Sequence, residues 1–121
     1  MSEQERFEAS DIEQNKVMAV LSYLGILVLV PILAAPNSKF ARFHANQGLI
    51  VAIIGVAAVI LFAILYNIAW ATLSLGLVTV VSILSYIVWI GIVVLEIIGI
   101  INAAQGTGKA LPLVGSIKIL K

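Results

Sequence analysis

The sequence predicts an all-α integral membrane protein with three transmembrane helices. Of its 121 residues, 62% are hydrophobic and 11% are charged, whereas about a quarter of the residues in a soluble domain are charged. Three apolar runs are each long enough to cross a hydrocarbon core of about 30 Å as a helix. We expect these spans at about residues 17–35, 47–70 and 78–104, within one transmembrane domain of residues 17–121.

Residues 1–16 form a polar, acidic tail before the first apolar run, with five acidic and two basic side chains. A secretory signal would begin with a positive region and end at a small-residue cleavage site, and neither feature is present here. Acidic polar stretches seldom fold alone. We therefore expect a solvated or interfacial tail, with a binding tail as the alternative.

The three expected spans differ in their polar residues. The first contains Pro31, which removes a backbone hydrogen bond and can kink a helix. The second ends at Trp70, which we expect to anchor it at the membrane interface. The third is charged only at Glu96 and is longer than the minimum, so one tilted span is expected, with a split into two short segments as the alternative. A short interfacial segment should follow it, because Gly106 and Gly108 end the helix.

The stretch KFARFHANQG, residues 39–48, gathers polar side chains between the first two expected spans. A Pro-Asn-Ser turn precedes it, and Ser38 can cap a helix that begins near Lys39. This lead-in should be helical and interfacial. Phe40 and Phe43 lie three residues apart in it, and we expect both rings to anchor the helix at the headgroup level.

Polar side chains inside apolar helices are costly unless they face other helices, so they are the candidate functional or bundle-facing residues. The candidates are Arg42, His44, Gln47, Glu96 and Asn102. Since an intramembrane carboxylate needs a partner or a proton, we expect Glu96 to pair with Arg42 or His44.

Glu96 belongs to a stripe along one face of the third expected helix. The stripe contains hydroxyl, aromatic and small residues, namely Ser82, Ser85, Tyr86, Trp89, Glu96, Gly99 and Ala103. Gly99 and Ala103 also form a small-xxx-small pair suited to close helix packing. We interpret the stripe as the side facing the helix bundle, with a conduction or proton-relay surface as the alternative.

The composition of the sequence argues against several classes of function. It has no cysteine, one histidine and a formal charge of +1, which disfavours thiolate chemistry, a metal site and nucleic-acid binding. The segment GTGK lacks the spacing of a phosphate-binding loop. We therefore expect a protein without enzymatic activity, cofactor or metal, whose partners are the lipid bilayer and either further copies or other membrane proteins.

The distribution of basic residues predicts an orientation. With three spans, one side of the membrane receives five basic residues, which are Lys39, Arg42, Lys109, Lys118 and Lys121. The other side receives only Arg6 and Lys16. Because lysine and arginine favour the cytoplasmic side, we expect a multi-pass protein of the cytoplasmic membrane with its N-terminus outside and its C-terminus inside.

Three segments resemble a family of small prokaryotic membrane proteins related to the channel subunit of the chloroplast inner-envelope protein import machinery. ARFHANQG at residues 41–48 is similar to the R-F-H-x-x-Q hallmark of that family. INAAQGTGKALPLVG at residues 101–115 resembles its final helix and turn, and NKVMAVLSYLG at residues 15–25 resembles its first span. The resemblance implies a helical membrane protein of the import-component type. The chloroplast relatives are thought to have four spans, whereas three are expected here.

The leading functional hypothesis is a non-enzymatic subunit or scaffold of a membrane assembly. The alternative is a conduit for ions, small solutes or polypeptide, formed by self-association and lined by the Glu96 stripe. Three helices enclose too little space for a pore in one copy, so conduction would require an oligomer.

Overall fold

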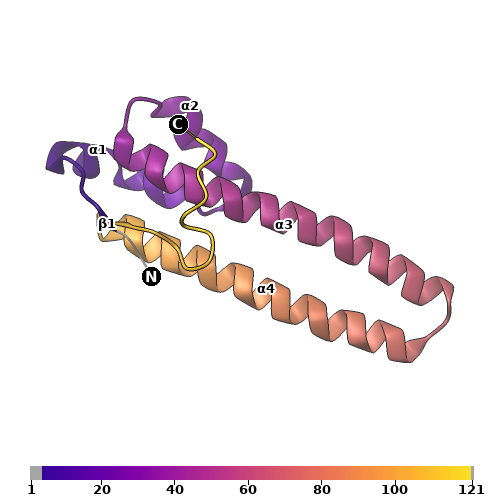
Figure 1. Cartoon of the computed structure of the whole chain (residues 1–121). Helices are drawn as coiled ribbons and strands as arrows, with labels where there is room; N and C mark the ends of the chain where they lie inside the picture. Colours follow the sequence, from indigo (N-terminus) through magenta and orange to yellow (C-terminus); the bar gives the residue numbers. More distant parts are fainter. Residues whose placement is uncertain (1–3, 121) are drawn as a thin grey trace.

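A computed structural model describes residues 4–120, and its largest feature is a hairpin of two long helices. Helix α3 (Lys39–Ala71, 33 residues) and helix α4 (Leu75–Ala104, 30 residues) run side by side in opposite directions (Figure 1). The shorter elements gather at the end where α3 begins and α4 ends, which we call the packed end. They are α1 (Ala9–Leu21), the 3₁₀-helix η1 (Gly25–Val28), α2 (Leu29–Ala34), β1 (Gln4–Glu5) and β2 (Gly108–Lys109).

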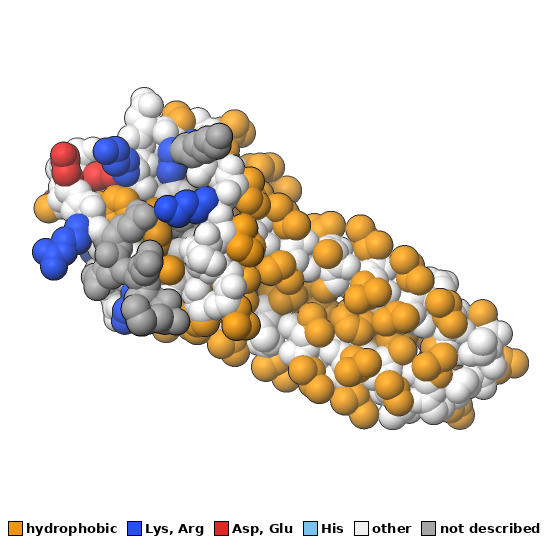
Figure 2. Space-filling view, in the orientation of Figure 1, with side chains coloured by type: hydrophobic (Ala, Val, Ile, Leu, Met, Phe, Trp, Pro, Cys, Tyr) orange, Lys and Arg blue, Asp and Glu red, His pale blue; other side chains and the backbone are white. Residues whose placement is uncertain are grey.

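Helices α3 and α4 are long and apolar enough to cross a membrane. Their lengths correspond to about 50 and 45 Å at 1.5 Å per residue, and their most apolar stretches have mean hydropathies of 3.1 and 2.5. Only 28% and 11% of those stretches are buried inside the protein. Hydrophobic side chains cover the hairpin from the packed end to its tip (Figure 2). A surface this apolar belongs in lipid, which makes this a membrane protein.

The first expected span, residues 17–35, is not formed. Helix α1 ends at Leu21, and Gly25 then has a φ of 63°, in the left-handed region that glycine adopts without strain. After this reversal, η1 and α2 return beside the start of α3 (Figure 1). Helix α2 has only six residues and contains Pro31, so it is far too short to cross about 30 Å. Within residues 4–120 the structure therefore has two candidate spans, and three transmembrane helices are not confirmed.

The acidic tail is also more ordered than expected. Residues 9–16 form the first part of α1, which packs against both α3 and α4. Ala19, further along the same helix, has no exposed surface. The segment expected to be a solvated or interfacial lead-in thus forms part of a helix at the packed end, and its residues 9–16 are exposed or half-buried.

The two ends of the described chain lie together. Strands β1 and β2 are antiparallel partners, with Gln4 opposite Lys109 and Glu5 opposite Gly108. A membrane cannot separate two hydrogen-bonded strands, so the structure does not support an outer N-terminus combined with an inner C-terminus. Lysine and arginine side chains gather at the packed end in Figure 2. Lys121, one of the five basic residues expected on the cytoplasmic side, lies outside the described residues.

The limits of the long helices follow from local capping. As expected, α3 begins at Lys39, and the Ser38 hydroxyl accepts a hydrogen bond from the Ala41 amide at 3.0 Å. Ser74 caps α4 in the same way, accepting from Leu77 at 3.1 Å. Helix α4 ends as expected at a glycine, because Gly106 has a φ of 72° and donates to the Ala103 carbonyl at 3.1 Å.

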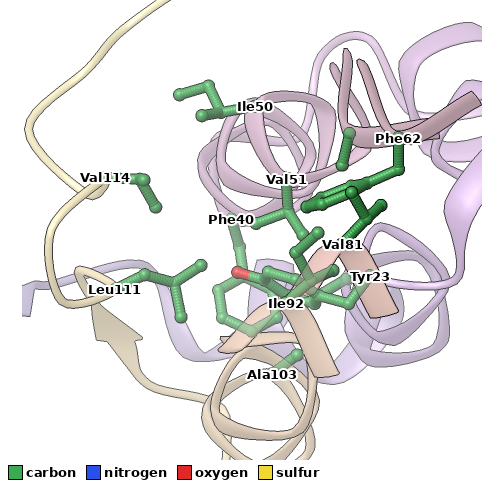
Figure 3. Close-up of a cluster of buried hydrophobic side chains, with 12 residues drawn as sticks. Tyr23, Phe40, Ile50, Val51, Phe62, Val81, Ile92, Ala103, Leu111 and Val114 are labelled. Atoms are coloured by element: carbon green, nitrogen blue, oxygen red, sulfur yellow. The ribbon is translucent and has the colours of Figure 1, made fainter. Parts of the chain in front are cut away.

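Two glycines allow the chain after α1 to enter between the long helices. A Cβ atom at Gly48 of α3 would lie 1.7 Å from the Ser22 carbonyl oxygen. A Cβ atom at Gly99 of α4 would lie 2.3 Å from the ring of Tyr23. Figure 3 shows Tyr23 among buried side chains from both long helices. The core of the packed end therefore depends on the absence of side chains at these two positions.

We predict that Gly48→Ala and Gly99→Ala each lower the free energy of unfolding by about 1–3 kcal/mol, because overpacking forces neighbouring backbone or rings to move. Thermal denaturation of the purified protein in detergent would measure the change. Gly55→Ala and Gly91→Ala are the matched controls, since nothing lies within 4 Å of a Cβ atom at either position. Equal losses in all four variants would contradict the close packing of Ser22 and Tyr23 on the two helices.

Candidate functional site

Three polar side chains near the start of α3 bind the segment that follows α4. They are His44, Asn46 and Gln47, which we call the tail-binding residues, and all three are buried. Each of them has a partner in residues 105–120, which we call the C-terminal segment. The polar stretch of the sequence thus has a definite role, because it fastens the C-terminal segment to the beginning of α3.

His44 is hydrogen-bonded at both ring nitrogens. Its Nε2 atom lies 2.9 Å from the Thr107 carbonyl oxygen, which can only accept, so Nε2 carries the proton and donates. Its Nδ1 atom lies 2.6 Å from the Tyr23 hydroxyl and accepts from it. These partners define one neutral tautomer. They also show that the expected pairing of His44 with Glu96 is wrong.

Asn46 and Gln47 bind backbone groups of the C-terminal segment. Asn46 donates from Nδ2 to the Ile117 carbonyl at 2.8 Å, and its Oδ1 accepts from the amides of Ile119 and Leu120. Gln47 accepts from the Leu111 amide at 2.9 Å. The Nε2 atom of Gln47 is buried and finds no acceptor among the described residues.

Asp11 of α1 fixes the first turn of α3, a role that is not predicted from the sequence. Its carboxylate accepts from the Ser38 hydroxyl at 2.5 Å, the Phe40 amide at 3.0 Å and the Asn15 side chain at 2.9 Å. Partial burial raises the pKa of Asp11, but hydrogen bonds from these groups outweigh it, so the net pKa lies below the ordinary value. A charged carboxylate also interacts favourably with the N-terminus of α3.

The two phenylalanines of the lead-in have different environments. Phe40 has no exposed surface, and its ring lies 5.6 Å from Phe7 and 4.9 Å from His44, measured between ring centres. It is therefore a core residue and not the expected interface anchor. Phe43 is half-buried between the same two rings. Trp70 is 56% exposed near the hairpin tip, and its anchoring role stays a prediction.

The Glu96 stripe is only partly enclosed. Gly99 and Ala103 are buried, and Ser82 accepts a hydrogen bond from the Tyr66 hydroxyl of α3 at 2.9 Å, as a bundle-facing stripe requires. Tyr86, however, is 71% exposed.

Glu96 and the remaining candidates are separated from one another. Glu96 is half-buried, and within residues 4–120 no hydrogen bond or ion pair reaches its carboxylate. The expected ion pair with Arg42 is therefore not formed. Arg42 is half-buried near the start of α3. Asn102 is buried at the end of α4, where its backbone carbonyl accepts from the amide and hydroxyl of Thr107.

The polar side chains of this site form hydrogen bonds to other segments of the same chain, which is a structural role. Among the described residues, no three histidine or carboxylate side chains lie close enough to hold a metal ion. Both nitrogens of His44 are engaged, and the bonds of Asn46 go to the chain's own backbone. Asp11, Phe7 and Tyr23 could not have been identified from sequence spacing, because each acts on residues at least 21 positions away.

We predict that Tyr23→Phe lowers the free energy of unfolding by about 1–3 kcal/mol, because it leaves the buried Nδ1 atom of His44 without a donor. A double-mutant cycle with His44→Leu, read by thermal denaturation in detergent, isolates the pair. We expect a coupling energy above about 0.5 kcal/mol. Tyr66→Phe is a control that removes a hydroxyl from a hydrogen bond elsewhere. Additive effects of Tyr23→Phe and His44→Leu would contradict the pairing.

Comparison with known proteins finds relatives that are magnetosome proteins. A stretch of 51 residues is 47% identical to the magnetosome protein MmsF of Paramagnetospirillum magneticum, covering 42% of this chain and 46% of that protein. Stretches of 37 residues match the magnetosome protein MamF of the same organism at 49% identity and that of Magnetospirillum gryphiswaldense at 46%. Each of these covers 31% of this chain and 33% of the relative.

The comparisons correct the family expected from the sequence. No family model matches the chain, and no solved structure matches it. The relatives are magnetosome proteins, so the resemblance to the import-component family was wrong. The matched stretches span less than half of each relative. Over part of its length, this chain is therefore similar to the magnetosome proteins MmsF and MamF.

Proposed function

We propose that the protein is a non-enzymatic scaffold subunit of a membrane assembly, in which the α3–α4 hairpin is held in lipid and the packed end is presented on one side. The main support is the distribution of polarity. Apolar side chains cover the hairpin, while the hydrogen-bonded core and the basic residues lie at one end. The names of the relatives favour an assembly of the magnetosome kind.

The orientation follows from the same distribution. Arg6, Lys16 and the other described basic residues belong to segments of the packed end, whereas the tip, residues 72–74, carries no charge. Since basic residues favour the cytoplasmic side, the packed end faces the cytoplasm and the tip reaches the opposite side. Both ends of the described chain are then cytoplasmic.

We predict that single cysteines at Ser10 and Ser116 are protected from an impermeant thiol reagent in intact cells, while a cysteine at Leu73 is labelled. The chain has no cysteine of its own, and all three positions are exposed. Permeabilised cells provide the control, because all three variants should then react. Labelling at Ser116 together with protection at Leu73 would reverse the proposed orientation.

The alternative function is a self-associating conduit, and one observation favours it. Glu96 is a half-buried carboxylate in an apolar helix, without a partner among the described residues. Such a residue often marks an ion pathway. Against this, Gly99 is covered by Tyr23 and Ser82 is bonded to Tyr66, so part of the stripe is already occupied within one copy.

For the scaffold function, we predict that liposomes containing the purified protein show no ion flux above protein-free liposomes. Glu96→Gln should leave this result unchanged, because the carboxylate does not line a pathway. The proteoliposomes would be loaded with a fluorescent ion indicator, and a channel-forming peptide would serve as the positive control. A steady ion flux that Glu96→Gln abolishes would contradict the scaffold proposal and support the conduit.

A further inference from the structure

The chain between α1 and α2 turns back at the packed end and exposes large apolar side chains there. We call residues 24–30 the reversal loop, which contains η1 and the first turn of α2. Its large apolar side chains are between 37% and 77% exposed, with the exception of the buried Val28: Leu24, Ile26, Leu27, Leu29 and Val30. Residues 17–38 carry no charged side chain. A continuous surface of this kind indicates contact with something apolar.

We propose that the reversal loop inserts into the lipid leaflet on the side of the packed end, as a wedge that is present in one leaflet only. The inference rests on the proposed placement of the α3–α4 hairpin in lipid. The loop packs against α3 (Figure 1), whose own exposed apolar side chains lie in that lipid. Lipid acyl chains that cover the hairpin therefore also reach the loop beside it.

The depth of the reversal loop matches the edge of the hydrocarbon core. Exposed apolar side chains reach the hairpin tip, where Leu73 is 85% exposed, so the surplus length of α3 lies at the packed end. A span of about 20 residues counted back from Ala71 begins near Val51. The Ser22 carbonyl, just before the loop, lies against Gly48, about 5 Å outside that level at 1.5 Å per residue. Interfacial apolar faces are buried about 5–10 Å into this boundary.

The backbone of the reversal loop suits a poorly hydrated place, where an unpaired amide or carbonyl is costly. The amides of Tyr23, Leu24 and Leu27 each donate to the carbonyl three residues earlier, at 3.2–3.3 Å. Leu29 donates to Ile26 in the same way. Irregular backbone is tolerated at membrane depth where it packs against protein, and α3 provides that support.

The wedge makes the protein broader in one leaflet than in the other. Within residues 4–120, α3 and α4 alone reach the tip, whereas α1, η1 and α2 join them at the packed end (Figure 1). Lipids on the packed side are therefore pushed apart, and a bend that makes this side convex relieves the crowding. Insertion of apolar faces at the headgroup level is sensitive to curvature for the same reason. The protein thus favours a membrane whose convex face carries the packed end.

Fluorescent labels on single cysteines would measure depth in liposomes of the full chain. The label at Ile26→Cys should be quenched by brominated acyl chains and protected from iodide present on both sides, whereas the label at Ser10→Cys should show the opposite pattern. Ile64→Cys, within α3, reports the hairpin itself. Iodide quenching at Ile26→Cys as strong as at Ser10→Cys would overturn the insertion. Loss of bromine quenching at Ile64→Cys would instead contradict the placement of the hairpin in lipid.

Tethers pulled from giant vesicles would measure the curvature preference. An impermeant fluorophore on Ser10→Cys reports only the copies whose packed end faces outward. Their tether-to-vesicle density ratio should exceed one, because the outer face of a tether is convex. Copies labelled at Leu73→Cys have the opposite orientation, and their ratio should fall below one.

Two substitutions in the Ser10→Cys background separate the wedge from the rest of the packed end. Ile26→Asp should lower the density ratio to one, because a carboxylate resists insertion. Ile26 is 77% exposed, so the fold should persist, and circular dichroism would check it. Asn37→Asp adds the same charge in the exposed turn before α3 and should keep the enrichment. A ratio of one for both labels in the unsubstituted chain, or an equal loss in both aspartate variants, would overturn the proposal.

Discussion

The two hydrogen bonds of His44 join three parts of the chain that are far apart in sequence. Through Tyr23 the imidazole holds the reversal after α1, and through Thr107 it holds the turn that ends α4. The bond to Tyr23 is buried and the bond to Thr107 is partly buried, and an unpaired polar atom in a buried place costs about 1–3 kcal/mol. The other contacts of the packed end depend on this geometry, since Tyr23 also fills the space beside Gly99 and Thr107 also closes the end of α4.

This constraint explains why the first apolar run does not form one continuous helix. A continuous helix over residues 17–35 would carry Ser22 and the Tyr23 hydroxyl into hydrocarbon without these partners. Reversing at Gly25 instead brings the Ser22 carbonyl against Gly48 and the Tyr23 ring against Gly99. Hydropathy alone does not distinguish these outcomes, because η1 and α2 remain apolar and largely exposed.

Features set by local sequence were predicted well. The structure confirms three features that follow from neighbouring residues. They are the cap at Ser38, the two long helices α3 and α4, and the end of α4 at a glycine. Features set by distant pairing were not predictable. Asp11 acts on Ser38 and Phe40 across 27 and 29 positions, and nothing in the acidic tail marks it as different from its neighbours. Phe40 is buried by contacts with residues distant in sequence, so its burial was not predicted either. The expected pairing of Glu96 with Arg42 or His44 was wrong for the same reason.

The packed end and the hairpin tip depend on different forces. At the packed end, buried hydrogen bonds and close contacts at glycines connect α1, α3 and the C-terminal segment. Toward the tip, α3 and α4 share the bond between Tyr66 and Ser82 and otherwise pack apolar side chains. Lipid tails are as apolar as these side chains, so burying them against one another gains little hydrophobic free energy. The tip can therefore exchange its helix contacts for those of another membrane protein at low cost, while the packed end keeps its structure. The scaffold function that we propose would use this division between a fixed polar end and an adaptable apolar surface.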